Sequence, residues 1–107
     1  MTQKDEKLKE VIRMLAAEFF SRESNRTSLI TITSVELKSR NSKAVILFTV
    51  MPIDQEAAAL DFMRRQLRDL REYVGEHARM MRVPFFEVSI DKGEKNRQHI
   101  DELSRNV

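Results

Sequence analysis

Hydrophobic and polar positions along the chain predict three helices and three strands. Over two long segments the apolar residues recur every three or four positions, the spacing of a helix with one buried face. Three shorter runs are rich in β-branched or aromatic residues and are bounded by polar residues or proline, as strands are. In chain order the predicted elements are helix 4–22, strand 29–38, strand 43–51, helix 54–81, strand 85–91 and a short helix that follows Gly93 and carries Ile100 and Leu103.

The order of these elements predicts the fold class. The polar residues 39–42 join two strands and indicate a hairpin. With the helices on one face of three strands, the chain is expected to form a two-layer α+β sandwich. Its 107 residues, 41% of them hydrophobic, are enough for one core but not for two, so we expect a single domain over 1–107 with short flexible ends.

The second predicted helix is long for so small a domain, and a break in it is expected. Gly75 lies inside it, and glycine costs about 1 kcal/mol relative to alanine in a helix interior. From the residues alone, a bend near Gly75 is plausible. Met80 and Met81 would close this helix and fill the core.

Composition and motifs argue against an enzyme, a metal site or a membrane protein. The chain has no cysteine and only two glycines, so thiol chemistry and glycine-rich phosphate loops are excluded. His77 and His99 fall on different predicted helices, and we interpret both as surface or boundary residues. No apolar run is long enough to cross a bilayer, and the N-terminus does not look like a signal peptide. We expect a cytoplasmic protein without catalytic residues, cofactor, metal, membrane contact or small-molecule substrate; a reaction centre would need an unexpected pocket around His77.

The net charge of +2 conceals an uneven distribution. Residues 22–43 and residues 64–82 each carry a net charge of +3, whereas the rest of the chain carries −4. Two cationic segments in an otherwise acidic chain are typical of a nucleic-acid-binding protein. On a continuous helix, the arginines at 64, 68, 71, 79 and 82 would share roughly 80° of arc beside the apolar stripe.

For both segments an interpretation without nucleic-acid binding is also open. The arginine strip could be a solvated helix face, held by ion pairs such as Arg65–Asp69 and Arg68–Glu72. The basic residues around the hairpin could serve solubility alone. A hypothesis of another class is a protein–protein module in which a sheet edge pairs with a partner or a second copy; an exposed Phe85 and the apolar run KAVILFTVM (43–51) motivate it.

Several segments taken together resemble the bacterial ribosome-binding factor A family, over about Lys7 to Leu103. The pattern R-x-P-x-x-x-V-x-x-D followed by G-E-K-x-R-x-x-I-x-x-L is unusual and lies between Arg82 and Leu103. The other segments that carry the resemblance are LITITSVEL (29–37), SKAVILFTVMP (42–52), EAAALDF (56–62), ARMMRVPFFEVSID (78–91) and GEKNRQHIDEL (93–103).

The resemblance implies a type-II KH-like fold with a three-stranded mixed sheet, a kinked helix and a C-terminal helix. It also implies a non-catalytic protein, a monomer when free, that binds the small ribosomal subunit and its rRNA during late maturation. KH relatives grip nucleic acid through a G-x-x-G loop between paired helices, and this family has a kinked A-x-G there. Counted back from Pro84, that kink aligns near residues 66–68 rather than at Gly75.

Resemblance and charge distribution together select the candidate site residues. We expect them to act mainly on RNA phosphates, giving affinity and position rather than base identity. The candidates are Arg26, Lys38, Arg40, Lys43, Arg64, Arg68, Arg71, Arg79 and Arg82.

Overall fold

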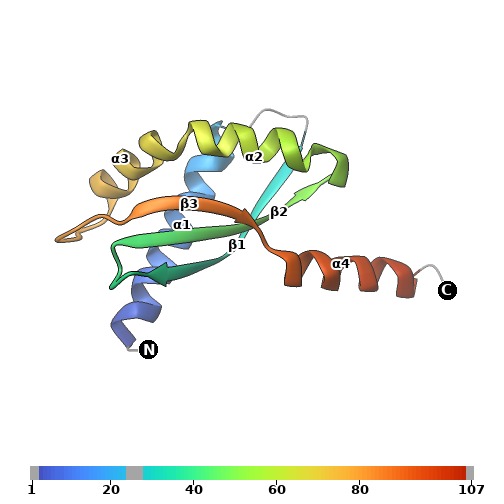
Figure 1. Cartoon of the computed structure of the whole chain (residues 1–107), viewed down its shortest axis with the longest axis horizontal. Helices are drawn as coiled ribbons and strands as arrows, with labels where there is room; N and C mark the ends of the chain where they lie inside the picture. The colour runs from blue at the N-terminus through green and yellow to red at the C-terminus, as the bar shows by residue number, and fades with distance from the viewer. Residues whose placement is uncertain (1–2, 24–27, 106–107) are drawn as a thin grey trace.

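A three-stranded sheet with helices packed against it forms the body of the protein, and one further helix projects from its end (Figure 1). The computed structural model describes residues 3–23 and 28–105, and the side chains of residues 4–22 and 28–98. The elements are α1 (Gln3–Glu23), β1 (Leu29–Lys38), β2 (Lys43–Met51), the short 3₁₀ helix η1 (Ile53–Gln55), α2 (Glu56–Arg65), α3 (Leu67–His77), β3 (Phe85–Ile90) and α4 (Lys92–Arg105). The predicted order and the α+β class are confirmed.

Strand order in the sheet is β1-β2-β3. β1 and β2 are antiparallel, with Lys38 opposite Lys43 and Leu29 opposite Met51, and their bounds are those expected from the sequence. β2 and β3 are parallel, with Lys43 opposite Phe85, and the helical segment between them makes the crossover that parallel strands need. The run KAVILFTVM is therefore a central strand whose two edges are already paired. The interpretation of this run as a strand free to pair with a partner is wrong.

One hydrophobic core lies between the sheet and helices α1, α2 and α3. Alternate residues of β2, namely Ala44, Ile46, Phe48 and Val50, belong to it, as the period of two in a strand requires. Phe20, Phe48 and Phe86 are also buried in this core. Fully burying a side chain of this size contributes about 1.5–3 kcal/mol to stability. Core residues with 0% exposure include Ile12, Ala16, Met63, Leu70 and Val74 on the helices.

The long helix breaks at Gln66 and not at Gly75. Gln66 has φ −97° and ψ −1°, and its N–H donates to the Met63 carbonyl at 3.0 Å, a tightened turn that separates α2 from α3. Both halves can then direct a buried residue at the core, Met63 from α2 and Leu70 from α3. Gly75 lies in the last turns of α3. Of the two positions that the sequence left open for the bend, Gly75 and residues 66–68, the structure has it at the second.

The same helix also ends earlier than its apolar pattern suggests. Ala78 has extended backbone angles, φ −130° and ψ 138°, so α3 stops at His77 and residues 78–84 form an irregular segment. Met80 packs partly against the core, as expected. Met81 is fully exposed, so its expected core role is wrong. The apolar spacing would place Met81 on the buried face of a continuous helix, but α3 has already ended at His77.

α4 leaves the end of β3 and points away from the sheet (Figure 1). Its first turn is held to the body of the protein by Asp91 and by a salt bridge between Lys95 and Glu56, with Nζ and Oε1 3.1 Å apart. The side chains of Ile100 and Leu103, expected on one side of this helix, lie outside the described residues. Within the described part of the chain, no helix is long and apolar enough to span a membrane.

Candidate nucleic-acid interface

The hairpin of the first cationic segment and the last residues of the second lie at the same end of the sheet. Because β2 and β3 are parallel, both strands begin at this end, and Lys43 of the hairpin lies opposite Phe85. The Phe85 N–H donates to the Ser42 carbonyl at 2.9 Å, which joins the hairpin to the segment after α3. In Figure 1 the hairpin tip and residues 78–84 both lie at the left, far from α4. We call this end, comprising residues 38–43, α3 and residues 78–86, the basic end.

The hairpin tip holds an arginine in an unusual backbone conformation. Ser39, Arg40 and Asn41 have φ of 53°, 55° and 66°, and the Ser42 N–H donates to the Ser39 carbonyl at 3.1 Å. Tight hairpin turns require such positive φ values at their central residues and therefore favour asparagine or glycine. The amide of Asn41 donates to Asp5 on α1 at 3.0 Å, which ties the tip to the helix. Arg40 is exposed between these fixed neighbours.

The three candidate basic residues of the hairpin differ in their surroundings. Lys43 lies 3.0 Å from Glu87 of β3, measured from Nζ to Oε1, so its charge is partly compensated. Lys38 lies opposite Lys43 in the ladder and, like Arg40, has no ion-pair partner among the described residues. A Lys–Lys pair directly across a ladder repels. The hairpin therefore presents uncompensated positive charge at Lys38 and Arg40.

Arg64 at the end of α2 and Arg68 at the start of α3 are exposed. The proposed ion pairs Arg65–Asp69 and Arg68–Glu72 do not form in the described part of the chain. The break at Gln66 places the members of the first pair on different helices, so the i,i+4 geometry is lost. The interpretation of these arginines as a helix face held by its own salt bridges is wrong.

Arg71 is not a free surface charge. Its Nη2 donates to the Val83 carbonyl at 3.0 Å and its Nε donates to the Pro84 carbonyl at 3.3 Å. The guanidinium carbon lies 4.2 Å from the centroid of the Phe85 ring, which is a cation–π contact. Arg71 thus fixes the segment that enters β3, and it holds its guanidinium against an aromatic ring that is 64% exposed.

Arg79 and Arg82 are exposed on the irregular segment that follows α3. The expectation that they continue a helical strip with the earlier arginines is wrong, because α3 ends at His77. They belong to the basic end because they lie on the segment that connects the end of α3 to the start of β3. Arg26, the remaining candidate, lies outside the described residues.

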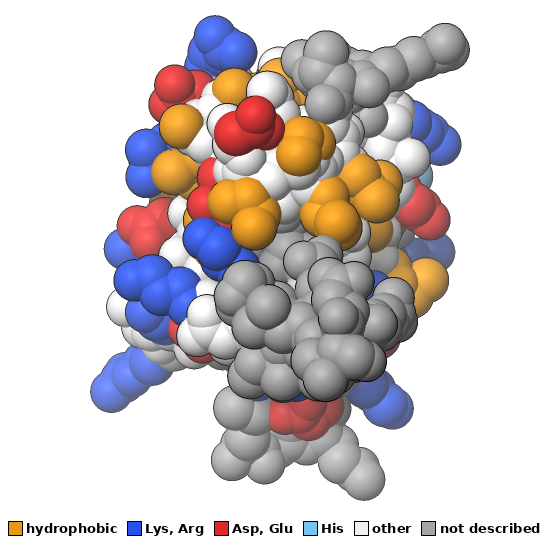
Figure 2. All heavy atoms as spheres, turned by 90° about the vertical axis from the view of Figure 1, so that its right-hand side faces the viewer, with side chains coloured by type: hydrophobic (Ala, Val, Ile, Leu, Met, Phe, Trp, Pro, Cys, Tyr) orange, Lys and Arg blue, Asp and Glu red, His pale blue; other side chains and the backbone are white. Residues whose placement is uncertain are grey.

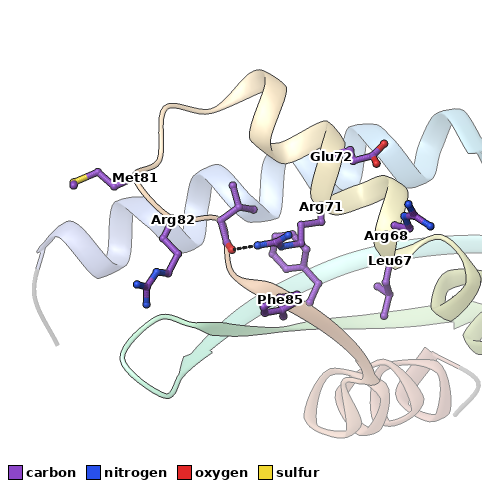
Figure 3. Close-up of a pocket in the computed structure, with 9 residues that line it drawn as sticks. Leu67, Arg68, Arg71, Glu72, Met81, Arg82 and Phe85 are labelled. Atoms are coloured by element: carbon purple, nitrogen blue, oxygen red, sulfur yellow. Dashed lines mark hydrogen bonds between the residues drawn. The ribbon is translucent and has the colours of Figure 1, made fainter.

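A groove runs between α3 and the segment that enters β3 (Figure 3). Its volume is about 580 Å³. The residues that line it are Leu67, Arg68, Arg71, Glu72, Met81, Arg82, Val83, Phe85 and Phe86. The sequence pattern did not single out Leu67 or Val83 as part of a site. The spacing of four residues between Leu67 and Arg71 would have placed those two side chains on one helix face.

His77, the one histidine whose side chain is described, takes part in packing. Its ring stacks on Tyr73 with centroids 4.0 Å apart, and its Nδ1 lies 2.8 Å from the Tyr73 carbonyl oxygen. The Tyr73 hydroxyl donates to Glu18 of α1 at 3.1 Å. His77 is exposed, as expected, and an open hollow of about 640 Å³ lies beside it, lined also by Glu76 and Arg79. Among the described side chains, no group of histidines and carboxylates could hold a metal ion.

The end of the sheet opposite the basic end has a different surface. Leu29 and Met51, paired at the far end of the hairpin, are exposed, as is Ile53 in η1. Figure 2 shows the molecule from the side of α4, where hydrophobic side chains gather on the surface and basic side chains lie toward its margins. The uncompensated positive charge is therefore not spread evenly over the molecule.

A mixed sheet in the order β1-β2-β3 beneath a kinked α2–α3 pair, with a basic end, defines a small α+β protein of the type-II KH-like class. The chain belongs to the ribosome-binding factor A family, whose sequence model matches residues 4–104. No curated protein sequence matches the chain significantly.

Solved structures show the same fold. The crystal structure of ribosome-binding factor A from Thermus thermophilus is 23% identical, with a TM-score of 0.70 over 78% of this chain and 91% of that one. An NMR structure of a Thermotoga maritima protein assigned as a ribosome binding factor A is 20% identical, with a TM-score of 0.67 over 80% and 85%. A Thermus thermophilus homology model fitted into a cryo-EM map of a 30S–RbfA complex is 22% identical, with a TM-score of 0.65 over 74% and 86%.

Proposed function

We propose that the protein is a non-catalytic assembly factor that binds RNA of the small ribosomal subunit and assists late rRNA maturation in the cytoplasm. The observation that carries this proposal is that basic residues of the hairpin and of the segment after α3 lie at one end of the sheet, where several arginines have no carboxylate partner among the described residues. Such guanidinium groups offer forked donors to phosphate oxygens. The family supports the ribosome as the source of the RNA, because a related Thermus thermophilus protein was fitted into a 30S complex.

The surroundings of the candidate residues rank them for this role. Exposed groups without a carboxylate partner in the described part of the chain are the best phosphate ligands, whereas Lys43 is weakened by Glu87. Arg71 acts as a positioning residue for residues 83–85 because its donors are engaged by two carbonyls. Arg26 stays a prediction. The proposed phosphate ligands are Lys38, Arg40, Arg68, Arg79 and Arg82 at the basic end, and Arg64 at the end of α2.

The small net charge shapes the proposed mode of binding. Phosphate contacts supply affinity and orientation but no sequence information. A protein with a net charge of only +2 has little long-range attraction for arbitrary RNA. Binding therefore depends on an RNA surface whose shape brings its phosphates against the basic residues. We propose that the free protein is a monomer and that it recognises the shape of an incompletely folded region of rRNA.

Sedimentation of the purified protein with mature and immature small subunits tests this function. The proposal predicts association with the particles, a preference for the immature one, and a steep loss of binding between low and moderate salt as counterions compete. Equal binding to both particles would reduce the function to general RNA affinity. Absence from both pellets at low salt would contradict the proposal.

A further inference from the structure

The groove beside α3 combines positive charge with an exposed aromatic ring. Pockets of about 300–1,000 Å³ are typical of sites for small ligands, and the groove, at about 580 Å³, falls in this range. Arg68 and Arg82 line it and have no ion-pair partner among the described residues. Leu67 and Val83 supply apolar surface. An anionic ligand with a flat apolar part matches these features.

Arg71 and Phe85 form a fixed stacked pair inside this groove, with the guanidinium over one face of the ring. Two carbonyl acceptors hold the guanidinium of Arg71, so its orientation does not depend on a ligand. The ring of Phe85 lies against it at 4.2 Å and is still 64% exposed. In Figure 3 both side chains lie between α3 and the strand entry, with Arg68 and Arg82 on either side. Planar guanidinium and aromatic groups are the surfaces on which unpaired bases stack.

We propose that this groove binds one unpaired nucleotide of single-stranded RNA, with its base stacked on the face of the Phe85 ring that Arg71 leaves free and its flanking phosphates beside Arg68 and Arg82. This inference rests on the proposed RNA-binding function and adds a subsite for a base. A base inside a duplex is stacked and paired, so it cannot reach a ring that lies within a groove. The subsite therefore selects single-stranded segments, whereas the phosphate ligands alone do not.

Fluorescence anisotropy with a short RNA that lacks self-complementarity, alone or annealed to its complement, tests the subsite. Phe85→Ala removes the ring, and Arg71→Lys keeps the charge but loses the planar fork. We expect each variant to lose affinity for the single strand roughly five- to a hundredfold, with affinity for the duplex little changed. Leu29→Ala is the matched control, because Leu29 is 65% exposed at the opposite end of the sheet, and this variant should bind like the wild type.

A scan with single abasic positions in the same RNA shows whether a base occupies the groove. One abasic position should weaken binding to the wild type as much as Phe85→Ala does, and should not weaken the variant further. Equal losses for single strand and duplex, or abasic losses that add to those of Phe85→Ala, would overturn the subsite.

The two proposals can fail separately. Wild-type protein that sediments with small subunits but shows no difference between Phe85→Ala and Leu29→Ala would leave the assembly function intact and remove the nucleotide subsite. Thermal unfolding of each variant shows whether a lost interaction reflects a lost fold. An exposed ring contributes little to the core, so Phe85→Ala should unfold near the wild-type temperature.

Discussion

Arginines that are equivalent in the sequence have distinct roles in the folded chain. Arg71 is bound by two carbonyls and a ring, whereas Arg68, one helical turn earlier, is exposed. The spacing of residues in the sequence predicts that both arginines lie on one helix. It does not predict the partners of Arg71, because these belong to a segment whose path depends on where the helix ends. The pairing of Lys43 with Glu87 was equally hidden, because it depends on the register between β2 and β3.

Arg40 provides a residue-scale prediction. Its φ of 55° is unfavourable for an arginine, since left-handed conformations cost L-residues other than glycine and asparagine roughly 1–2 kcal/mol. Arg40→Asn should raise the free energy of unfolding in urea by about 0.5–1 kcal/mol and at the same time weaken sedimentation with small subunits. Arg82→Asn, at a residue without positive φ, should weaken binding without the gain in stability. A destabilised Arg40→Asn protein would contradict this interpretation of the hairpin tip.

At the scale of elements, the sequence predicts the strands better than the long helix. The β-branched runs and the polar connection between them determine the bounds of β1 and β2, because the pattern of these strands is local. The apolar spacing of the helix continues from Met63 through Leu67 to Leu70 without a signal at Gln66. The break depends on how two helical segments fit over one sheet, which is a property of packing. The family resemblance located it, whereas glycine propensity did not.

Gly75 can be tested as an ordinary helical position. It lies within α3 with negative φ, and a Cβ added there would meet Val83 Cγ2 at 3.5 Å, an ordinary van der Waals contact. Gly75→Ala should therefore stabilise the protein by about 0.5–1 kcal/mol in urea unfolding. If Gly75 were a hinge that the fold requires, the same substitution would destabilise the protein.

Asp91 links the sheet to α4 and gives the fold a dependence on pH. Thr33, at a β-bulge in β1, donates its hydroxyl to Asp91 Oδ2 at 2.6 Å, and the Glu94 N–H donates to Oδ1 at 3.0 Å. The Thr33 hydrogen bond, followed by that from Glu94, lowers the pKa of Asp91 from its ordinary value of 3.8. A depressed carboxyl pKa stabilises the folded state above the ordinary value, and this contribution is lost as pH falls through the folded pKa.

Asp91→Asn should accordingly lower the free energy of unfolding at neutral pH by about 1 kcal/mol, because the amide oxygen still caps the helix but accepts weaker hydrogen bonds from Thr33 and Glu94 than a charged carboxylate does. The difference from the wild type should narrow as pH falls below about 4. Urea unfolding followed by circular dichroism at several pH values measures both effects. A difference that stays constant down to strongly acidic pH would show that the carboxylate charge is not involved.

At the scale of the whole molecule, the fold separates two surfaces. The parallel pairing of β2 with β3 brings the hairpin and the segment after α3 to one end, while the exposed Leu29, Met51 and Ile53 and helix α4 lie at the other. The sequence shows which segments are cationic, and the family resemblance suggests a polyanion for them. Neither shows that residues far apart in the chain, such as Arg40 and Arg82, belong to the same end, because that follows only from the parallel register.

The most direct test of the central claim is co-sedimentation of two charge-reversed proteins with immature small subunits. Arg40→Glu with Arg82→Glu changes the basic end, and Lys92→Glu with Arg97→Glu makes the same change in net charge on α4. A triple reversal of Arg64, Arg68 and Arg71 to glutamate is less suitable, because a glutamate at position 71 cannot donate to the Val83 and Pro84 carbonyls that fix the segment entering β3. We predict that the first protein loses binding at least tenfold more than the second while both remain folded. Equal losses, or none, would contradict an RNA interface at the basic end.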